Sequence, residues 1–181
     1  MDDILKASEE RMKKALEHVR HEMVSIRTGR ATPALLEPLR VDYYGTPTPI
    51  SQMAQITSPD ARMLVIQPWD KGMLGAIEKA IQKSELGINP TNDGNVIRLA
   101  LPHPTEERRK DLVKQVHQRA EEGRVAVRNI RRDGMDQLKR VESVSEADIK
   151  RGQERLEKIT SQHIHEVDEV SKQKETEVLE V

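Results

Sequence analysis

A run of small and apolar residues between positions 105 and 141 strongly constrains what this 181-residue chain can fold into. The residues recur at steps of three and four, close to the heptad spacing that buries one stripe of a helix. They are Val113, Val116, Ala120, Gly123, Val127, Ile130, Gly134, Leu138 and Val141. About 37 helical residues at about 1.5 Å each span roughly 55 Å. The spacing therefore predicts one long helix with a narrow buried stripe.

Two further segments have the same periodicity and predict two more helices, over 4–28 and 146–179. The apolar positions of the first are Leu5, Met12, Ala15, Leu16, Val19, Met23 and Ile26. The stripe of the last contains Ile149, Leu156, Ile159, His163, Val167, Val170 and Val178. Thr105 is a candidate N-cap for the middle helix, and Ser145 with Asp148 three residues on resembles a capping box for the last.

The composition agrees with long helices that expose wide polar faces. Charged residues make up 34 % of the chain, hydrophobic residues 35 %, and the mean hydropathy is -0.71. The chain has no cysteine, which excludes disulfides, thiolate metal sites and a cysteine nucleophile and fits a reducing compartment. The acidic opening lacks the features of a signal or transit peptide, and no apolar run approaches the roughly 20 residues of a membrane span. We therefore predict a cytoplasmic protein that does not bind a membrane.

The middle of the chain, residues 31–104, has a different character, with all nine prolines and all three aromatic residues. Short strands are predicted at Arg40–Tyr44, Met53–Thr57, Met63–Gln67 and Val96–Leu101. Turns are predicted at 45–49 and 89–95. Asp70 is a candidate cap for a helix over about 71–85, with Gly87 near its end.

The order of these elements predicts an α+β protein of two domains. Residues 1–30 and 105–181 would form a three-helix bundle, and residues 31–104 a small inserted β/α/β domain. The chain would then cross the boundary twice, side by side, at 29–33 and 101–105. Two proline-containing crossings predict a hinge of limited freedom. The residues of this predicted hinge are Gly29, Arg30, Ala31, Thr32, Pro33, Pro102, His103, Pro104 and Thr105.

The sequence contains no pattern that predicts catalysis. There is no phosphate-binding loop, no nucleophile elbow and no Ser/His/Asp arrangement. The histidines lack the spacing of known metal motifs and are interpreted as surface or buried-stripe residues. They are His18, His21, His103, His117, His163 and His165. We predict that the protein is not an enzyme and binds no metal or cofactor, although a small hydrolase with an unrecognised acid pair is an alternative.

The segment RNIRRDG at 128–134 carries the strongest functional signal of the long helix. Arg128 and Arg131, like Arg124 before them, each follow a buried-stripe residue by one position, so they lie about 100° round the helix. Arg132 widens this row, and Asp133 is the only acid between Gly123 and Met135. Guanidinium groups match phosphate oxygens in a bidentate manner, so a phosphate backbone is the predicted partner. The alternative is that these arginines pair with acids on neighbouring helices.

Arginines also occur at the end of the first helix, where Arg27 and Arg30 flank Gly29. They could bind the same partner, or they could oppose the helix dipole as cations at its C-terminus. Residues 105–140 have a net charge of about +4 by residue count, although the whole chain carries -1. Tyr43 and Tyr44 could stack a base, but neighbouring strand residues face opposite ways, so at least one of them should be packed inside. These features predict recognition of the backbone of a large folded RNA, with no DNA binding.

Four segments of the chain resemble the bacterial ribosome recycling factor family. They are SIRTGRATPALL at 25–36, VDYYGTPTPISQMA at 41–54, TEERRKDLVK at 105–114 and RVAVRNIRRDG at 124–134. The resemblance follows nearly the whole chain, and the segments keep their order. It implies an L-shaped monomer that binds the ribosomal RNA of the large subunit after termination. With elongation factor G and its GTP hydrolysis, such a protein splits the post-termination complex.

The resemblance also implies roles for individual residues. Ribosomal RNA contacts are carried over to Arg27, Arg30, Arg128, Arg131 and Arg132, with Arg131 the most critical, and the predicted surface also contains Arg124 and Asn129. The small domain and the hinge would meet elongation factor G. A coiled-coil-like adaptor that binds other proteins through its charged helices is the alternative function.

Overall fold

The computed structural model describes residues 1–180 and contains two compact units. The helical unit contains Met1–Arg27 and Glu106–Leu179, and the small unit contains Thr28–Thr105. Long helices make up the first unit, and short strands with one short helix make up the second. The predicted α+β fold class, with long helices and a small sheet domain, is confirmed.

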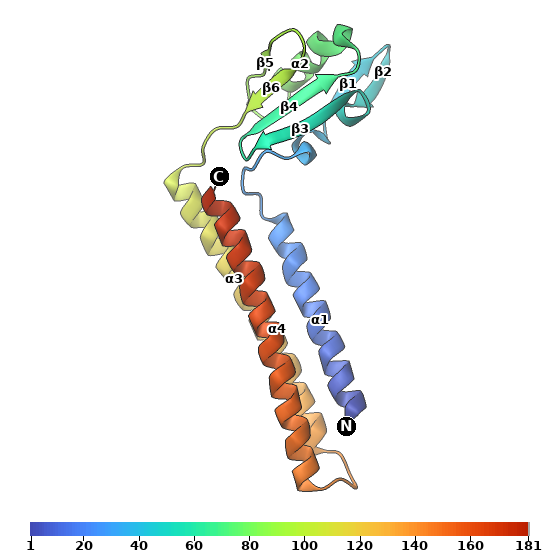
Figure 1. Cartoon of the computed structure of the whole chain (residues 1–181), viewed down its shortest axis with the longest axis vertical. Helices are drawn as coiled ribbons and strands as arrows, with labels where there is room; N and C mark the ends of the chain where they lie inside the picture. The colour runs from blue at the N-terminus through green and yellow to red at the C-terminus, as the bar shows by residue number, and fades with distance from the viewer. Residues whose placement is uncertain (181) are drawn as a thin grey trace. The chain divides into compact units, whose positions relative to one another are not determined.

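Three helices run along the helical unit: α1 (Asp2–Ser25), α3 (Glu106–Lys139) and α4 (Glu146–Glu180) (Figure 1). Ser145 precedes α4, and its hydroxyl oxygen accepts a hydrogen bond from the Asp148 amide at 3.1 Å. The same hydroxyl donates to the Asp148 carboxylate at 2.8 Å. The predicted capping pair at the start of α4 is therefore present. The helix α3 ends before Val141, which the sequence placed in its buried stripe.

Two aliphatic clusters fill the helical unit, one after the other along its length. Leu16, Val19, Met23, Val116 and Val167 are members of the first cluster. The second has Leu5, Met12, Val127, Leu138 and Leu156 among its members. Each cluster draws on all three helices, so the predicted stripes of α1, α3 and α4 do face one another.

The glycines inside α3 mark places where neighbouring helices come very close. A Cβ atom on Gly123 would lie 2.2 Å from Cγ2 of Val19 on α1. A Cβ atom on Gly134 would lie 2.8 Å from both Leu156 Cδ2 on α4 and Ser8 Oγ on α1. A side chain at Gly123 would press on the stiff, β-branched Val19, and one at Gly134 would displace the ends of the Leu156 and Ser8 side chains. Glycine therefore allows this close packing at both positions, despite its helix cost of up to about 1 kcal/mol relative to alanine.

The small unit contains two antiparallel sheets. The first pairs β1 (Arg40–Tyr43) with β2 (Thr46–Pro49). The second has the order β3-β4-β6-β5 and is built from β3 (Ala54–Asp60), β4 (Met63–Pro68), β5 (Thr91–Asn92) and β6 (Ile97–Ala100). A single helix, α2 (Leu74–Gln82), follows a short 3-10 turn at Lys71–Met73. Its buried face joins one core with both sheets, including Val41, Ile50, Leu64, Ile66, Ile77 and Ile97.

Two predicted turns in this unit are in part strands. Residues 46–49 form β2, in which Thr48 pairs with Val41. Prolines are tolerated there because β2 pairs on one side only and needs few amide donors. A two-residue strand, β5, lies within the predicted 89–95 turn. Asp70 does cap the following turn, since its carboxylate accepts from the Gly72 amide at 2.9 Å, but the helix ends at Gln82 rather than near 85.

Candidate nucleic-acid interface

The predicted arginine surface lies on α3, where one helix positions five of its seven residues. Arg128, Asn129 and Arg132 are exposed, and Arg124 and Arg131 are half-buried beside the stripe. The stripe residues Val127 and Ile130 are buried, which orients their neighbours outward as predicted. The helix thus holds a row of guanidinium groups on a rigid support, and side chains on helices are placed more exactly than side chains on loops.

Ion pairs to α4 occupy two of these arginines. Arg124 Nε lies 3.1 Å from the Asp168 carboxylate, and Arg131 contacts the Glu157 carboxylate at 2.5 Å. For both residues the alternative interpretation, pairing with acids on a neighbouring helix, is therefore the arrangement found. The sequence left this alternative open, and the packing of α3 against α4 identifies the acids as Asp168 and Glu157.

Arg128 pairs within its own helix. Its guanidinium lies 3.4 Å from Glu121, two turns earlier in α3. The side chains of both residues are at least half exposed, and exposed pairs of this kind contribute only about 0–1 kcal/mol. Exchange of such a carboxylate for a phosphate oxygen therefore costs little.

Arg132 is exposed, and the structure of residues 1–180 shows no hydrogen bond or ion pair for it. The acid beside it, Asp133, faces Arg11 of α1 instead, at 3.3 Å from its guanidinium. Because the only acid of the local segment is occupied by another helix, Arg132 keeps an uncompensated charge. It is the arginine of this row that is most directly available to an external anion.

Arg27 and Arg30, which lie at or near the first segment of the predicted hinge, are outside α1. This helix ends at Ser25 with an extended Ile26 as its cap, and its last turn contains no basic residue. A charge influences the helix dipole mainly from within that last turn, so the dipole interpretation is weak for Arg27. Arg27 is the last residue of the helical unit, whereas Arg30 belongs to the small unit. Both are exposed, and Gly29, which precedes Arg30, has the positive φ of +79° that favours glycine.

The two segments of the predicted hinge are both bonded to the turn between β3 and β4. Ala31 donates its amide to the Ala61 carbonyl at 2.8 Å, and Leu101 donates its amide to the Arg62 carbonyl at 2.7 Å. His103 contacts the Arg62 guanidinium as well. Adjacent residues of one turn thus hold both crossing segments of the chain in place, within the small unit.

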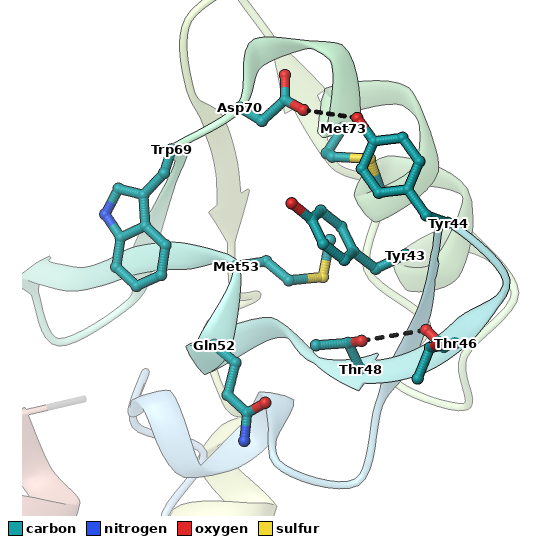
Figure 2. A pocket seen from close by; sticks show the side chains of 9 residues that line it. All are labelled: Tyr43, Tyr44, Thr46, Thr48, Gln52, Met53, Trp69, Asp70 and Met73. Carbon is teal, nitrogen blue, oxygen red and sulfur yellow. Dashed lines mark hydrogen bonds between the residues drawn. The ribbon is translucent and has the colours of Figure 1, made fainter.

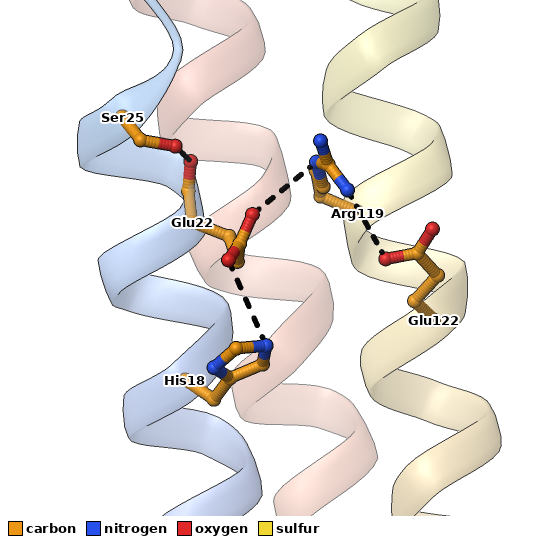
Figure 3. A network of polar contacts seen from close by, with 5 residues as sticks. All are labelled: His18, Glu22, Ser25, Arg119 and Glu122. Carbon is orange, nitrogen blue, oxygen red and sulfur yellow. Dashed lines mark hydrogen bonds and ion pairs between the residues drawn. The ribbon is translucent and has the colours of Figure 1, made fainter.

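A polar network links α1 and α3 on the surface of the helical unit (Figure 3). Glu22 of α1 is central to it, with Arg119 Nε of α3 at 3.4 Å and His18 Nε2 at 3.7 Å from its two carboxylate oxygens. Arg119 also reaches Glu122 at 3.4 Å. His18 is accordingly a surface histidine, and His163, which is buried, bonds to the Ile159 carbonyl at 2.8 Å. Both fit the interpretation given to the histidines from the sequence.

The expectation that Tyr43 or Tyr44 is packed inside is wrong. Tyr44 is 78 % exposed and Tyr43 is 38 % exposed. Tyr44 follows the end of β1 and has a φ of +49°, so the alternation of a strand does not apply to it. The two rings meet edge to face with their centres 4.7 Å apart.

The sequence reasoning missed Trp69, which is 70 % exposed and lies beside the same hollow of the small unit as the two tyrosines (Figure 2). A signal was available, because these are the only three aromatic residues of a chain without phenylalanine.

Two kinds of feature are absent from residues 1–180. No three histidine, aspartate or glutamate side chains there come together in a way that could hold a metal ion. No helix in this part of the chain has both the length and the apolar character to cross a membrane.

An α+β protein with a basic row on a long helix belongs to the class of proteins that can recognise a phosphate backbone. The comparisons with known proteins are more specific. The family model described as "Ribosome recycling factor" matches residues 4–179. The chain belongs to the ribosome recycling factor family, and the family and the function in ribosome recycling predicted from the sequence are thereby confirmed.

Relatives and solved structures agree over the full length. The ribosome-recycling factor of Syntrophomonas wolfei is 59 % identical and covers 99 % of this chain and 98 % of its own. That of Carboxydothermus hydrogenoformans is 55 % identical over 100 % of both chains. A solution structure of the ribosome recycling factor, 46 % identical, matches 99 % of this chain and 97 % of its own with a TM-score of 0.67.

A second solved structure contains a similar protein in a complex. It consists of models for the T. thermophilus ribosome recycling factor and the E. coli elongation factor G bound to the E. coli post-termination complex. That recycling factor is 47 % identical, the match covers 98 % of each chain, and the TM-score is 0.61.

Proposed function

We propose that this protein binds the ribosomal RNA of the large subunit after termination and, with elongation factor G and its GTP hydrolysis, splits the post-termination complex. Family membership and the similar protein in that complex support the proposal. The observation that carries it in this chain is the row of arginines on α3. Release of ribosome, mRNA and tRNA would follow from the splitting.

The α3 arginines would act through two mechanisms. Arg132, exposed and without an acid partner among residues 1–180, would bind a phosphate directly. Arg128 and Arg131 would exchange Glu121 and Glu157 for phosphate oxygens, since bidentate contacts to phosphate are strong and exposed ion pairs are weak. Arg124, Asn129, Arg27 and Arg30 would complete the surface.

In this proposal the protein is not an enzyme, and it works in the cytoplasm as a monomer without a cofactor. Its contribution is to occupy a site on the ribosome and to transmit force from a partner that hydrolyses GTP. A protein with this role needs a rigid helical unit, an RNA-binding face and a hinge, and it needs no set of catalytic residues.

Variants of the α3 arginines test the RNA-binding proposal. We expect Arg131→Glu and Arg132→Glu to fold normally, because both positions flank the buried stripe, and to lose large-subunit binding in a sedimentation assay. Each alanine variant should lose less. Arg132→Ala should also lower the salt dependence of binding by roughly 0.7–0.9, the slope lost with one phosphate contact.

Arg151→Glu is a matched control, because Arg151 is an exposed arginine on α4 whose one ion pair within residues 1–180 is with Asp148 of its own helix. It should sediment with the large subunit like the unchanged protein. Normal binding by Arg131→Glu and Arg132→Glu together would refute the assignment of this face. Binding that ignores salt would favour the protein-binding adaptor over an RNA-binding factor.

We further propose that the segments 29–33 and 101–105 form the hinge and that the small domain, residues 31–104, meets elongation factor G. Pro102 and Pro104 restrict one segment, so replacing both with glycine should widen its freedom. Subunit splitting should then fall while affinity for the large subunit stays nearly unchanged. An affinity loss as large as the loss of splitting would contradict a hinge role.

A further inference from the structure

A hollow on the small unit gathers all three aromatic residues of the chain. Its volume is about 650 Å³, and Tyr43, Tyr44, Thr46, Thr48, Gln52, Met53, Trp69, Asp70 and Met73 line it. Trp69 stands apart from the two tyrosines, with Met53 between them (Figure 2). The aromatic side chains come from two parts of the unit: Tyr43 and Tyr44 lie at the end of β1 and in the turn after it, and Trp69 follows β4.

The exposure of these rings is the unusual feature. The core of the small unit is built from aliphatic side chains and methionine, and none of the aromatic residues is in it. Scattered exposed apolar residues are common in proteins, but clustered ones mark binding sites. Tyrosine and tryptophan in particular are enriched where proteins bind other proteins.

The base of the hollow is apolar and adaptable. Met53 and Met73 are both buried, and their thioethers adjust to the shape of a ligand and contact aromatic groups favourably. The 3-10 turn Ile50–Gln52 adds Gln52, and β2 adds Thr46 and Thr48 at the side. The hollow thus has an apolar base, aromatic side walls, and a few hydroxyl and amide groups at its rim.

The charge of the hollow selects among ligands. Among residues 1–180, Asp70 is the only charged residue that lines the hollow, and no lysine, arginine or histidine of this range does. A phosphate or a nucleic-acid backbone would meet a negative charge there, whereas a cation would meet an acceptor and several ring faces. The α3 face, with its row of arginines, has the opposite charge and suits the opposite ligand.

Asp70 is held in place by its neighbours. One of its carboxylate oxygens accepts from the Gly72 amide at 2.9 Å, and the other accepts from the Tyr44 hydroxyl at 3.1 Å. The hydrogen bond that Tyr44 donates to Asp70, followed by the negative charge of that carboxylate, raises the pKa of Tyr44 above its ordinary value, so the phenol remains a donor. The acid is therefore fixed at the edge of the aromatic walls with lone pairs still free for a ligand.

From this geometry we infer that the hollow binds an arginine side chain presented by a protein partner. A guanidinium group is flat and stacks on the faces of tryptophan and tyrosine, and its fork of donors fits a carboxylate. Trp69 and Tyr43 supply the faces, and Asp70 supplies the carboxylate. The inference does not depend on the arginines of α3 or on ribosome binding.

The tryptophan gives a direct test, because Trp69 is the only one in the chain. The full-length protein is titrated with the peptide acetyl-Gly-Gly-Arg-Gly-Gly-amide while Trp69 emission is recorded. The same peptide with citrulline, the neutral analogue of arginine, is the matched ligand. We expect a saturable change with the arginine peptide and an affinity lower by about threefold to tenfold with citrulline.

Asp70→Asn is the corresponding protein variant, because asparagine keeps an oxygen for the Gly72 amide and removes the charge. Its affinity for the arginine peptide should be lower by about threefold to tenfold, and its affinity for the citrulline peptide should be unchanged. When the arginine peptide is added to the unchanged protein, the backbone amide shifts of Tyr43, Tyr44 and Trp69 should move and those of α3 should not. Trp69→Ala should bind both peptides more weakly, and its binding is measured from the same amide shifts because the variant has no tryptophan emission.

Four results would overturn the inference. One is equal affinity for arginine and citrulline peptides, and a second is an unchanged affinity in Asp70→Asn. The third is tighter binding of an uncharged proline peptide or of a single-stranded oligonucleotide than of the arginine peptide. A lysine peptide that binds as tightly as the arginine peptide would also count against it, since stacking is what distinguishes arginine.

Discussion

The helical unit and the small unit bury similar aliphatic side chains but present different surfaces. The helical unit has a long narrow core and is covered by ion pairs, such as those of Arg124 with Asp168 and Arg131 with Glu157. The small unit has a compact core and exposes its aromatic residues around a hollow that contains one acid.

The difference indicates two kinds of recognition in one chain. An arginine in a weak, exposed ion pair can exchange its carboxylate partner for a phosphate of a polyanion, and this exchange depends on the salt concentration. A fixed hollow with ring faces and a single carboxylate selects a ligand by shape as well as by charge. If the two units are as separate in stability as in surface chemistry, a substitution in one unit should leave the stability of the other unchanged.

The first prediction concerns the core of the small unit. Ile77 of α2 is fully buried there, so Ile77→Ala should destabilise this unit by about 2–5 kcal/mol through lost contacts and a cavity. Amide hydrogen exchange, read residue by residue, measures the effect. Amides of the small unit should exchange faster, and amides around Val116 and Leu156 should keep their protection.

Val24→Ala is the control, because Val24 is an apolar residue of α1 that is 80 % exposed. Its effect should stay within about 0.5 kcal/mol. If Ile77→Ala lowered protection equally in both units, the two units would unfold as one, and the comparison would fail at the level of stability.

The second prediction concerns the close approach of α1 and α3. In Gly123→Ala the added Cβ would lie 2.2 Å from Val19 Cγ2, so the Val19 side chain or one of the two helices must shift. Overpacking typically costs about 1–3 kcal/mol, and alanine returns up to about 1 kcal/mol in helix propensity. A net loss of about 1–2 kcal/mol should appear in denaturant unfolding of the helical unit.

Gly75→Ala provides the matched control in the other unit. Gly75 lies in α2, and a Cβ there would meet nothing within 4 Å. The same substitution should therefore be neutral or stabilise by up to about 1 kcal/mol. Two variants that behaved alike would mean that helix propensity, and not contact with Val19, decides the outcome at Gly123.

Periodicity predicted the long helices well, because each buries one stripe and exposes the rest. The same argument failed where polar residues occupy the stripe: Ser8, Thr160 and Ser171 are buried, whereas Ile149 and Ile159 are only partly so. Thr160 satisfies its hydroxyl with the Leu156 carbonyl at 2.8 Å, so its burial has no unpaired donor. Local hydrogen bonds of this kind are invisible to a hydrophobic pattern.

The candidate site was predictable only in part for a related reason. The arginines of α3 follow from residue type and spacing along one helix. Their partners Asp168 and Glu157 are on α4, and only the packing of the two helices brings them there. The hollow with Trp69 and Tyr44 likewise joins residues from separate elements, one of them in a left-handed turn conformation that strand alternation cannot predict.

The third and smallest effect concerns pH and the turn before β6. Two backbone amides, those of Val96 and Asn95, donate to the Asp93 carboxylate, and Arg98 pairs with it. Together they lower the pKa of Asp93 from 3.8 to about 2. A carboxyl group whose pKa is depressed on folding stabilises the fold above its unfolded value and loses that contribution as pH falls through its folded value. This turn should therefore be intact above about pH 4 and loosen towards pH 2.

The measurement is an NMR titration of the amides of Asn95 and Val96, whose shifts should move with a midpoint near the lowered pKa. Asp93→Asn keeps an acceptor for both amides but cannot titrate, so its shifts should stay constant over the same range. Amides of the helical unit, followed in parallel, report whether the acid has begun to unfold the rest of the chain. A midpoint near 3.8 in the unchanged protein would mean that the amides do not hold the carboxylate in solution. The turn would then owe its shape to the pairing of β5 with β6 alone.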